Sequence, residues 1–443
     1  MAHSVRSALE GPVRSYLRRL GPTWIAGAIA AGPATMATVL TAGASFRYRL
    51  LWVVVLAAVF GALAQYLAMR VGLLSERGLV SLVEDRLGSG WAWLLVVDVV
   101  LAAGLAQLVI MKTVADVSAF LTGVDARVWG VAWALALAIG LGWGGYRFLE
   151  VAAKALVAGV VVAFVASLGV VPIDLPAAAG GLVPAVPAGV DGALVAAAVL
   201  GGAVHVTLVT MQSYTMRARD WTVDDYGLGT FDVLTSMLLA FGAYGVAIYL
   251  VAAAVLYDPS ATVVDIDALG AAEALEPALG TFAHWLFLLG LWGAAVSTLG
   301  GNTVVPPFAL ADKLGIERTI DDRRYRALIV AVALASGAGA FLEGAFFPLL
   351  VLVLAFGLVG TPFALALVVY LANDPGAVDE RASWLSNLGG VVLIGVASLL
   401  AGNFVLDRWP VEGVLDGFVV AFAAVFGVAT VGVAWRFWRE GRR

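Results

Sequence analysis

The chain has no cysteine among its 443 residues, only three histidines, and 13% charged residues. The absence of cysteine excludes disulfides, iron–sulfur clusters and thiolate metal sites. So little charge beside 62% hydrophobic residues excludes an ordinary soluble protein. The net charge of −5 gives no basis for binding nucleic acid. Long polar segments are also missing, because every loop is shorter than about 30 residues and a soluble domain needs at least about 50.

Long apolar runs are what the sequence does contain. About twelve of them are long enough to cross a bilayer as helices, and they are centred near residues 33, 61, 106, 136, 160, 205, 243, 291, 333, 358, 394 and 425. The first run is too long for a cleaved signal and has no cleavage-like site before charge returns. The pattern predicts an all-α polytopic membrane protein that has the lipid bilayer as its surroundings.

The basic residues predict an orientation for these spans. Of the 26 Lys and Arg, only Arg47, Arg49, Arg127 and Arg408 fall in predicted outer loops, and Lys112 falls within a span. The others lie on one side, which positive-inside statistics assign to the cytoplasm. We therefore expect an integral protein of the cell membrane with both termini cytoplasmic.

The first span contains a predicted break. Gly32, Pro33, Ala34 and Thr35 lie near its middle. Proline cannot donate the i→i−4 hydrogen bond and disfavours helix at the residue before it. Unpaired backbone at this depth is tolerated only where it is buried in protein or lines a polar cavity. These four residues are therefore candidate substrate contacts, and Gly32 is a candidate flexible point.

The sixth span contains a second predicted break. A glycine pair at 201–202 precedes His205, and the candidate contacts here are Gly201, Val204, His205 and Thr207, with Gly201 as the flexible point. An ionisable residue within a span is a functional hypothesis by default, although a neutral histidine bonded to a neighbouring helix explains it equally well. Interrupted spans one and six are the layout of transporters built from two inverted five-helix repeats.

Several segments together resemble the NRAMP (natural resistance-associated macrophage protein) family of divalent-metal/proton symporters over nearly the whole chain. They are residues 21–24, 42–44, 51–52, 65–68 with Arg70, 146–150, 181–184 with Pro187, 273–280, 286–287 with Ser297, and 362–364. The resemblance implies a LeuT-like 5+5 inverted repeat with discontinuous helices 1 and 6 and about twelve transmembrane helices. The expected organisation is a cytoplasmic segment 1–20, repeat one 21–172, repeat two 190–372, and peripheral spans 11 and 12 at 383–438.

The ligand positions depart from the family pattern that this resemblance implies. The family's first-span DPGN supplies a carboxylate and an amide to the metal, where this chain has Gly32 and Thr35. The family's sixth-span methionine corresponds to His205, and the ends of its acidic third-span DLAE correspond to Gln107 and Ile110. The chain therefore resembles a divergent member without the usual metal ligands.

This loss weighs against a divalent metal as the substrate. Thr35 and His205 offer one hydroxyl and one imidazole besides backbone carbonyls, whereas Mn²⁺ or Fe²⁺ is held by carboxylate and softer donors. Desolvating a dication without counter-charge costs on the order of tens of kcal/mol. No confident metal site is assigned.

Two further groups of residues are candidates along the pathway. Gln107 and Lys112 are expected along the inner vestibule, and Asp116 lies at i+4 from Lys112, the spacing of a salt bridge. That pair is either structural, or Lys112 faces the vestibule, where its charge replaces a coupling cation or repels metals and favours a neutral or anionic substrate. Ser297 and Thr298 in span eight are a candidate sodium site, although such hydroxyls more often bond to their own helix.

Three functions stay open at this stage. We favour a secondary transporter working by alternating access on a small neutral or anionic solute. The alternatives are a divalent cation transporter with a rebuilt site, for example for hydrated Mg²⁺, and a non-transporting sensor or scaffold. The spans contain no HExxH, nucleophile elbow or paired acids, so neither an enzyme nor a cofactor is expected. Asp98 and Glu343 stand near predicted span ends and are assigned no role. The sequence indicates no coupling ion or oligomeric state.

Overall fold

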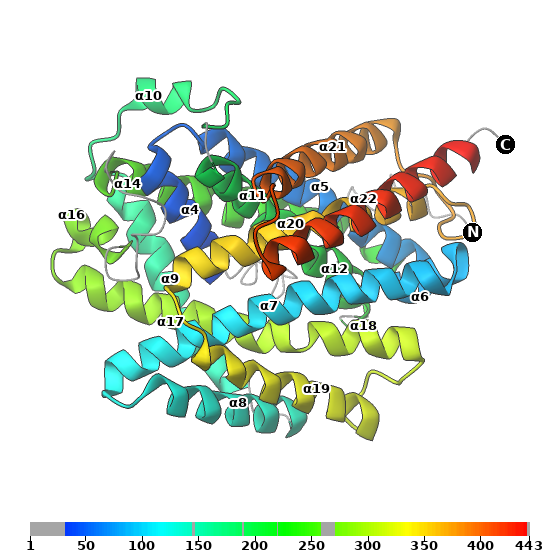
Figure 1. The fold of residues 1–443 in the computed structure, drawn as a ribbon, viewed down its shortest axis with the longest axis horizontal. Helices are drawn as coiled ribbons and strands as arrows, with labels where there is room; N and C mark the ends of the chain where they lie inside the picture. The colour runs from blue at the N-terminus through cyan, green and yellow to red at the C-terminus, as the bar shows by residue number, and fades with distance from the viewer. Residues whose placement is uncertain (1–31, 144–146, 188–189, 219, 258–270, 441–443) are drawn as a thin grey trace.

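The computed structural model describes residues 32–143, 147–187, 190–218, 220–257 and 271–440. Within these ranges most of the chain is helical, and the long helices run roughly parallel to the long axis of the molecule (Figure 1). The short helices α10 (Leu175–Gly180) and α16 (Glu276–Leu279) lie at one end, and α6 (Leu79–Leu87) lies at the other. This bundle is what long apolar segments with internally satisfied backbone are expected to form.

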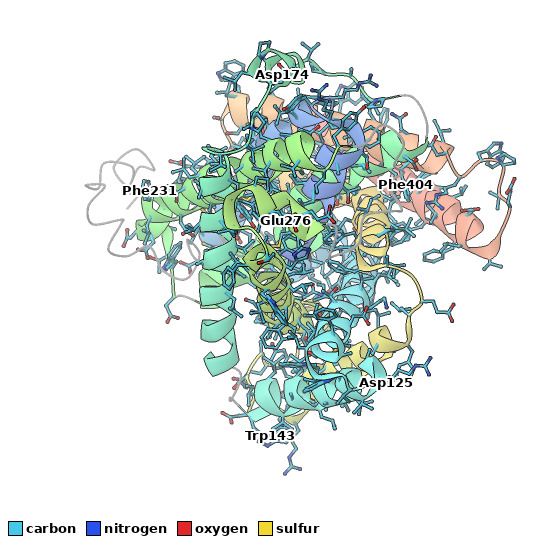
Figure 2. All side chains as sticks on the ribbon, turned by 90° about the vertical axis from the view of Figure 1, so that its left-hand side faces the viewer. Asp125, Trp143, Asp174, Phe231, Glu276 and Phe404 are labelled. Atoms are coloured by element: carbon cyan, nitrogen blue, oxygen red, sulfur yellow. The ribbon has the colours of Figure 1, made fainter. Side chains whose placement is uncertain are left out.

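The first five predicted spans correspond to five helices. These are α4 (Pro33–Phe46), α5 (Leu51–Ser75), α7 (Ser89–Thr122), α8 (Ala126–Trp143) and α9 (Arg147–Ser167). Figure 2 views the molecule from the end at the left of Figure 1, with Asp125, which precedes α8, and Trp143, at the end of α8, near one edge and Asp174, which caps α10, at the opposite edge.

The remaining spans follow in the same manner, with several interruptions. Span six consists of α11 (Val190–Val204) and α12 (Val206–Ala218), and span seven of η1 (Val223–Asp225), α13 (Tyr226–Leu234), the π-helical η2 (Thr235–Ala243) and α14 (Tyr244–Val255). After the short turn η4 (Glu273–Leu275), span eight consists of α17 (Phe282–Thr303) and α18 (Val305–Leu314), and span nine of α19 (Arg323–Ser336) and η5 (Gly337–Phe341). The last three spans are α20 (Phe346–Leu371), α21 (Trp384–Leu406) and α22 (Val414–Glu440).

Ten helical stretches of the described chain are long and apolar enough to cross a membrane. They coincide with ten of the predicted spans, which confirms the all-α membrane architecture. The other two predicted spans correspond to α4 and α9, and residues 22–31 of the first span lie outside the described residues.

Helix α20 lies at the centre of the bundle. Of its most apolar window, 94% is buried, compared with 33% for α21 and 28% for α22. It packs against α4, α7, α11 and α12 as well as the two outer helices. A helix that is apolar on all sides is covered either by protein or by lipid. Because protein covers α20, it forms a wall shared by the elements that carry the candidate site.

One end of the bundle is held by partly buried ion pairs. Arg86 Nη2 donates to Asp374 Oδ1 at 2.8 Å, and Lys313 Nζ donates to Glu84 Oε1 at 2.9 Å. Burial acts to raise the pKa of Asp374, but the hydrogen bonds from Arg86 and the Gly376 amide outweigh it, so this pKa lies below its usual range. The carboxylate form is therefore the one that stabilises this end.

Candidate functional site

Helix α4 begins at the predicted first break. Gly32 precedes it with an extended backbone (φ −72°, ψ −171°), Pro33 occupies the first helical position, and the Met36 amide donates to the Gly32 carbonyl at 3.1 Å. Proline is favoured there because its missing N–H belongs to the unpaired first turn. Pro33 and Thr35 are buried and Ala34 is half-buried. The part of the span before the break lies outside the described residues.

The second predicted break is present, and it falls at a single residue. Helix α11 ends at Val204, α12 begins at Val206, and His205 between them lies outside both helices. Its carbonyl accepts hydrogen bonds from the amides of Leu208 and Val209 at 2.9 and 3.2 Å. The interruption therefore leaves the His205 side chain at the junction of two half-helices.

The imidazole of His205 is bonded on one side only. Its Nδ1 lies 2.8 Å from the Thr207 hydroxyl oxygen, and the residue is 5% exposed. Its Nε2 is buried and has no hydrogen-bond partner among the described residues. A neutral imidazole has one donor and one acceptor nitrogen, so half of the hydrogen-bonding capacity of His205 is unused in this conformation, in which α20 covers Nε2.

On its other side, the imidazole of His205 packs against a glycine of α20. A Cβ atom on Gly357 would overlap the His205 ring. One turn further on, a Cβ atom on Gly360 would overlap the carboxyl group of Asp98 from α7. Both glycines are needed for these close approaches, since any other residue would occupy the space of an ionisable side chain.

Asp98 was not recognised as a site residue from the sequence. It is 1% exposed, and neither carboxyl oxygen has a hydrogen-bond partner among the described residues. The signal that could have found it is an acid flanked on both sides by Val-Val within an apolar run. Its position near the start of the span suggests exposure, but packing against α20 buries the side chain.

Gly201 has a packing role in this structure. It lies within α11, where a Cβ atom would overlap the carbonyl of Leu354 on α20. Helix α4 packs against both α11 and α20. The structure thus brings His205, Thr207 and Gly357 into contact, and α4 shares their neighbours.

Gln107 is bonded to the end of α17. Its amide nitrogen donates to Thr303 Oγ1 at 2.7 Å, and its amide oxygen accepts from Asn302 Nδ2 at 2.9 Å. The residue is 2% exposed. Its place along an inner vestibule stays a prediction.

Lys112 and Asp116 form the predicted ion pair. The Lys112 Nζ and Asp116 Oδ2 atoms are 2.9 Å apart, with the lysine side chain 11% and the aspartate 41% exposed. The structural interpretation of this pair therefore has direct support. Ser297 and Thr298 lie on α17, which packs on α4, and the sodium site stays a prediction.

Charge is scarce around the break. The described residues contain no group of three or more His, Cys, Asp or Glu that could hold a metal ion. Thr35, His205 and Thr207 contribute two hydroxyls and an imidazole. Such a donor set suits hydrogen bonding to a polar solute better than neutralising a dication.

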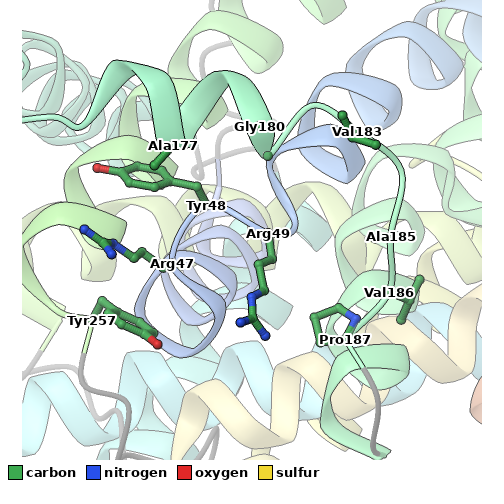
Figure 3. A pocket seen from close by; sticks show the side chains of 11 residues that line it. Arg47, Tyr48, Arg49, Ala177, Gly180, Val183, Ala185, Val186, Pro187 and Tyr257 are labelled. Atoms are coloured by element: carbon green, nitrogen blue, oxygen red, sulfur yellow. The ribbon is translucent and has the colours of Figure 1, made fainter.

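A separate cavity lies at the other end of α4. It has a volume of about 560 Å³ and is lined by Arg47, Tyr48, Arg49 and Tyr257 among others (Figure 3). The Arg47 guanidinium lies 5.6 Å from the Tyr48 ring centroid and 5.8 Å from that of Tyr257. The 14 residues of α4 place this cavity about 20 Å from Pro33, so it is distinct from the break.

Comparison with known proteins places the chain among membrane transporters. The family model described as "Natural resistance-associated macrophage protein-like" matches residues 23–407. A divalent metal cation transporter, MntH of Mycobacterium tuberculosis H37Rv, is 29% identical over 424 residues, covering 90% of this chain and 93% of its own. MntH of Bacillus subtilis 168 is 26% identical over 320 residues, covering 69% and 75%.

The solved structures that resemble this one share its fold. The Eremococcus coleocola manganese transporter matches with a TM-score of 0.73 at 15% identity, covering 99% of this chain and 97% of its own. The nucleobase-cation-symport-1 family transporter Mhp1 matches with a TM-score of 0.54 at 14% identity, covering 94% and 92%. At these identities the likeness concerns architecture alone.

Proposed function

The chain belongs to the natural resistance-associated macrophage protein-like family, and from that premise we propose that it carries its substrate by alternating access around the start of α4 and the break at His205. At the coarser level it is an integral membrane transporter, as its relatives are, and not an enzyme. We infer further that it lies in the cell membrane with both termini in the cytoplasm, because the basic residues gather on that side.

The substrate we propose is a small neutral or anionic solute. The observation that carries this proposal is the scarcity of charge at the break: the described residues form no group of three or more His, Cys, Asp or Glu that could hold a metal ion. Asp98, which packs one turn further along α20, forms no hydrogen bond with His205. The unpaired Nε2 atom, which α20 covers in this conformation, and the Thr207 hydroxyl are groups of the kind that orient a polar molecule once the site opens. Half-helix ends at a break add partial charges that suit such groups.

A divalent cation is the second candidate, and one observation favours it. The relatives of this chain are named as divalent metal cation transporters. In the structure, Asp98 lies against the same helix, α20, as His205. A largely hydrated Mg²⁺ keeps its own waters and needs few protein ligands. One carboxylate near the imidazole would be the smallest charge that such a rebuilt site requires.

Calorimetry on the purified protein separates the two candidates. We would titrate Mn²⁺, Cd²⁺ and Mg²⁺ into the native chain, into His205→Ala and into a control variant, His284→Ala. His284 is a half-buried histidine of α17 that lies near Glu276 of α16. The proposal expects no saturable heat from any metal. It also expects a stabilising solute, found by thermal-shift screening of neutral and anionic metabolites, to lose binding in His205→Ala and keep it in His284→Ala. Saturable metal heat that disappears only in His205→Ala would establish the cation instead.

A further inference from the structure

The carboxyl group of Asp98 lies in surroundings that cannot hold a negative charge. Both oxygens are buried without a hydrogen-bond partner among the described residues, and the group rests against the α20 backbone at Gly360. The amides of a helix interior are already committed to its own carbonyls. Burying an ionised carboxylate without donors is so costly that the group takes up a proton instead.

The helix on which Asp98 packs has one carbonyl without its helical donor. Pro362, inside α20, has no N–H to offer the carbonyl of Leu358. That carbonyl stands two residues from Gly360, on the helix against which Asp98 packs. A protonated carboxyl needs an acceptor for its O–H, and a proline within a helix supplies an extra one.

Other charged groups do not compensate Asp98. Helices α6, α8, α12, α17, α18, α19 and α20 and segment η5 pack on α7. Their described titratable side chains are Glu84, Asp85, Arg86, Arg127, Tyr214, His284, Asp312, Lys313, Arg323, Arg324, Tyr325, Arg326 and Tyr370, besides Lys112 and Asp116 on α7 itself. Among the described groups none forms a hydrogen bond or ion pair with the Asp98 carboxyl.

His205 is the ionisable group that shares this strip of α20. It faces Gly357, and Cβ positions three residues apart on a helix are about 5–6 Å from each other, so its Nε2 and the Asp98 carboxyl lie within about 10 Å. Two buried ionisable groups with open valences therefore border the same one-turn segment of the central helix. Because the dielectric constant between them is low, a change of charge at one group alters the electrostatic energy of the other.

We propose that Asp98 is a proton-binding site of this transporter, loaded in the conformation described here and emptied when α7 and α20 separate. The proton comes from water, forms the Oδ–H bond on binding, and returns to water on release, so no other reactant is needed. The direction of this cycle rests on the proposed transport function, whereas the proton site itself does not.

Infrared spectroscopy of the protein in lipid vesicles tests the site without any substrate. We expect a buried protonated-carboxyl band at neutral pH that is lost in Asp98→Asn. The control is Asp374→Asn, which removes a buried aspartate (8% exposed, compared with 1% for Asp98) that has an arginine partner, and it should keep the band. The band should shift in D₂O and vanish as the pH is raised, because a working site exchanges its proton with water.

Each contrary result overturns the proposal. A spectrum without an Asp98-dependent band would mean that the carboxyl is ionised. A band that neither exchanges in D₂O nor titrates would mean a permanently protonated structural residue. Should Asp98→Asn not fold, ¹³C-labelled aspartate in the native chain and in Asp98→Glu gives the same readout, since only the native band then carries the isotope shift. If transport fails while the band behaves as expected, the proposed function falls and the proton site stands.

Discussion

Replacing Gly357 by alanine tests whether the central helix holds His205 in place. The new methyl group would lie 2.7 Å from Cδ2 of His205 and closer still to Nε2, so the ring has to move. Overpacking of this kind costs about 1–3 kcal/mol. Losing the 2.8 Å contact between Nδ1 and the Thr207 hydroxyl adds about 0.5–1.5 kcal/mol. The helix preference of alanine over glycine returns about 1 kcal/mol.

We therefore expect Gly357→Ala to lower the free energy of unfolding by about 1–3 kcal/mol, measured by tryptophan fluorescence during equilibrium unfolding in mixed micelles. Gly104→Ala is the matched control, because a Cβ there meets open space, and it should be neutral or slightly stabilising. In a His205→Ala background the penalty of Gly357→Ala should largely vanish, since the colliding ring is gone. Equal behaviour of the two glycine variants, or an unchanged penalty without the ring, would refute the reasoning.

Two further predictions concern ion pairs. Asp116→Asn should destabilise the protein more than Lys112→Met, because the first leaves a buried ammonium unpaired and the second leaves a half-exposed carboxylate; thermal unfolding in detergent ranks them, and the reverse order would contradict this. Asp374→Asn should cost about 1.5–3 kcal/mol at neutral pH, the range for a hydrogen bond to a charged group. The pKa of Asp374 is lowered on folding, so the stabilisation by Arg86 is complete above the usual aspartate range and is lost as the pH falls through the folded value. The variant should therefore unfold with a flatter acid limb, and an unchanged limb would count against the pair.

The sequence contained enough information for the spans and for one of the breaks. Apolar length alone located ten of the helices, because crossing a bilayer leaves few other solutions. His205 was found because a histidine after two glycines interrupts an otherwise apolar run. Pro33 correctly marked the start of α4, while the half-helix expected before it lies outside the described residues.

The rest depended on contacts between distant segments. Nothing in the α7 sequence shows that Asp98 meets Gly360, since the two residues are brought together only by the packing of α7 on α20. In the same way, the packing of α7 on α17 determines that the Gln107 amide forms hydrogen bonds with residues at the end of α17. Position along a span indicates depth in the membrane, but it does not indicate which neighbour covers a side chain.

The glycines of α20 also limit how the selectivity of this transporter can change. Any side chain introduced at Gly357 or Gly360 displaces an ionisable group, either His205 at the α11–α12 junction or Asp98 on α7, so the central helix cannot itself acquire a new ligand without displacing one of these groups. Substitutions that change the specificity, whether in evolution or by engineering, therefore have to occur on α7 and at the α11–α12 junction, while α20 keeps its glycines.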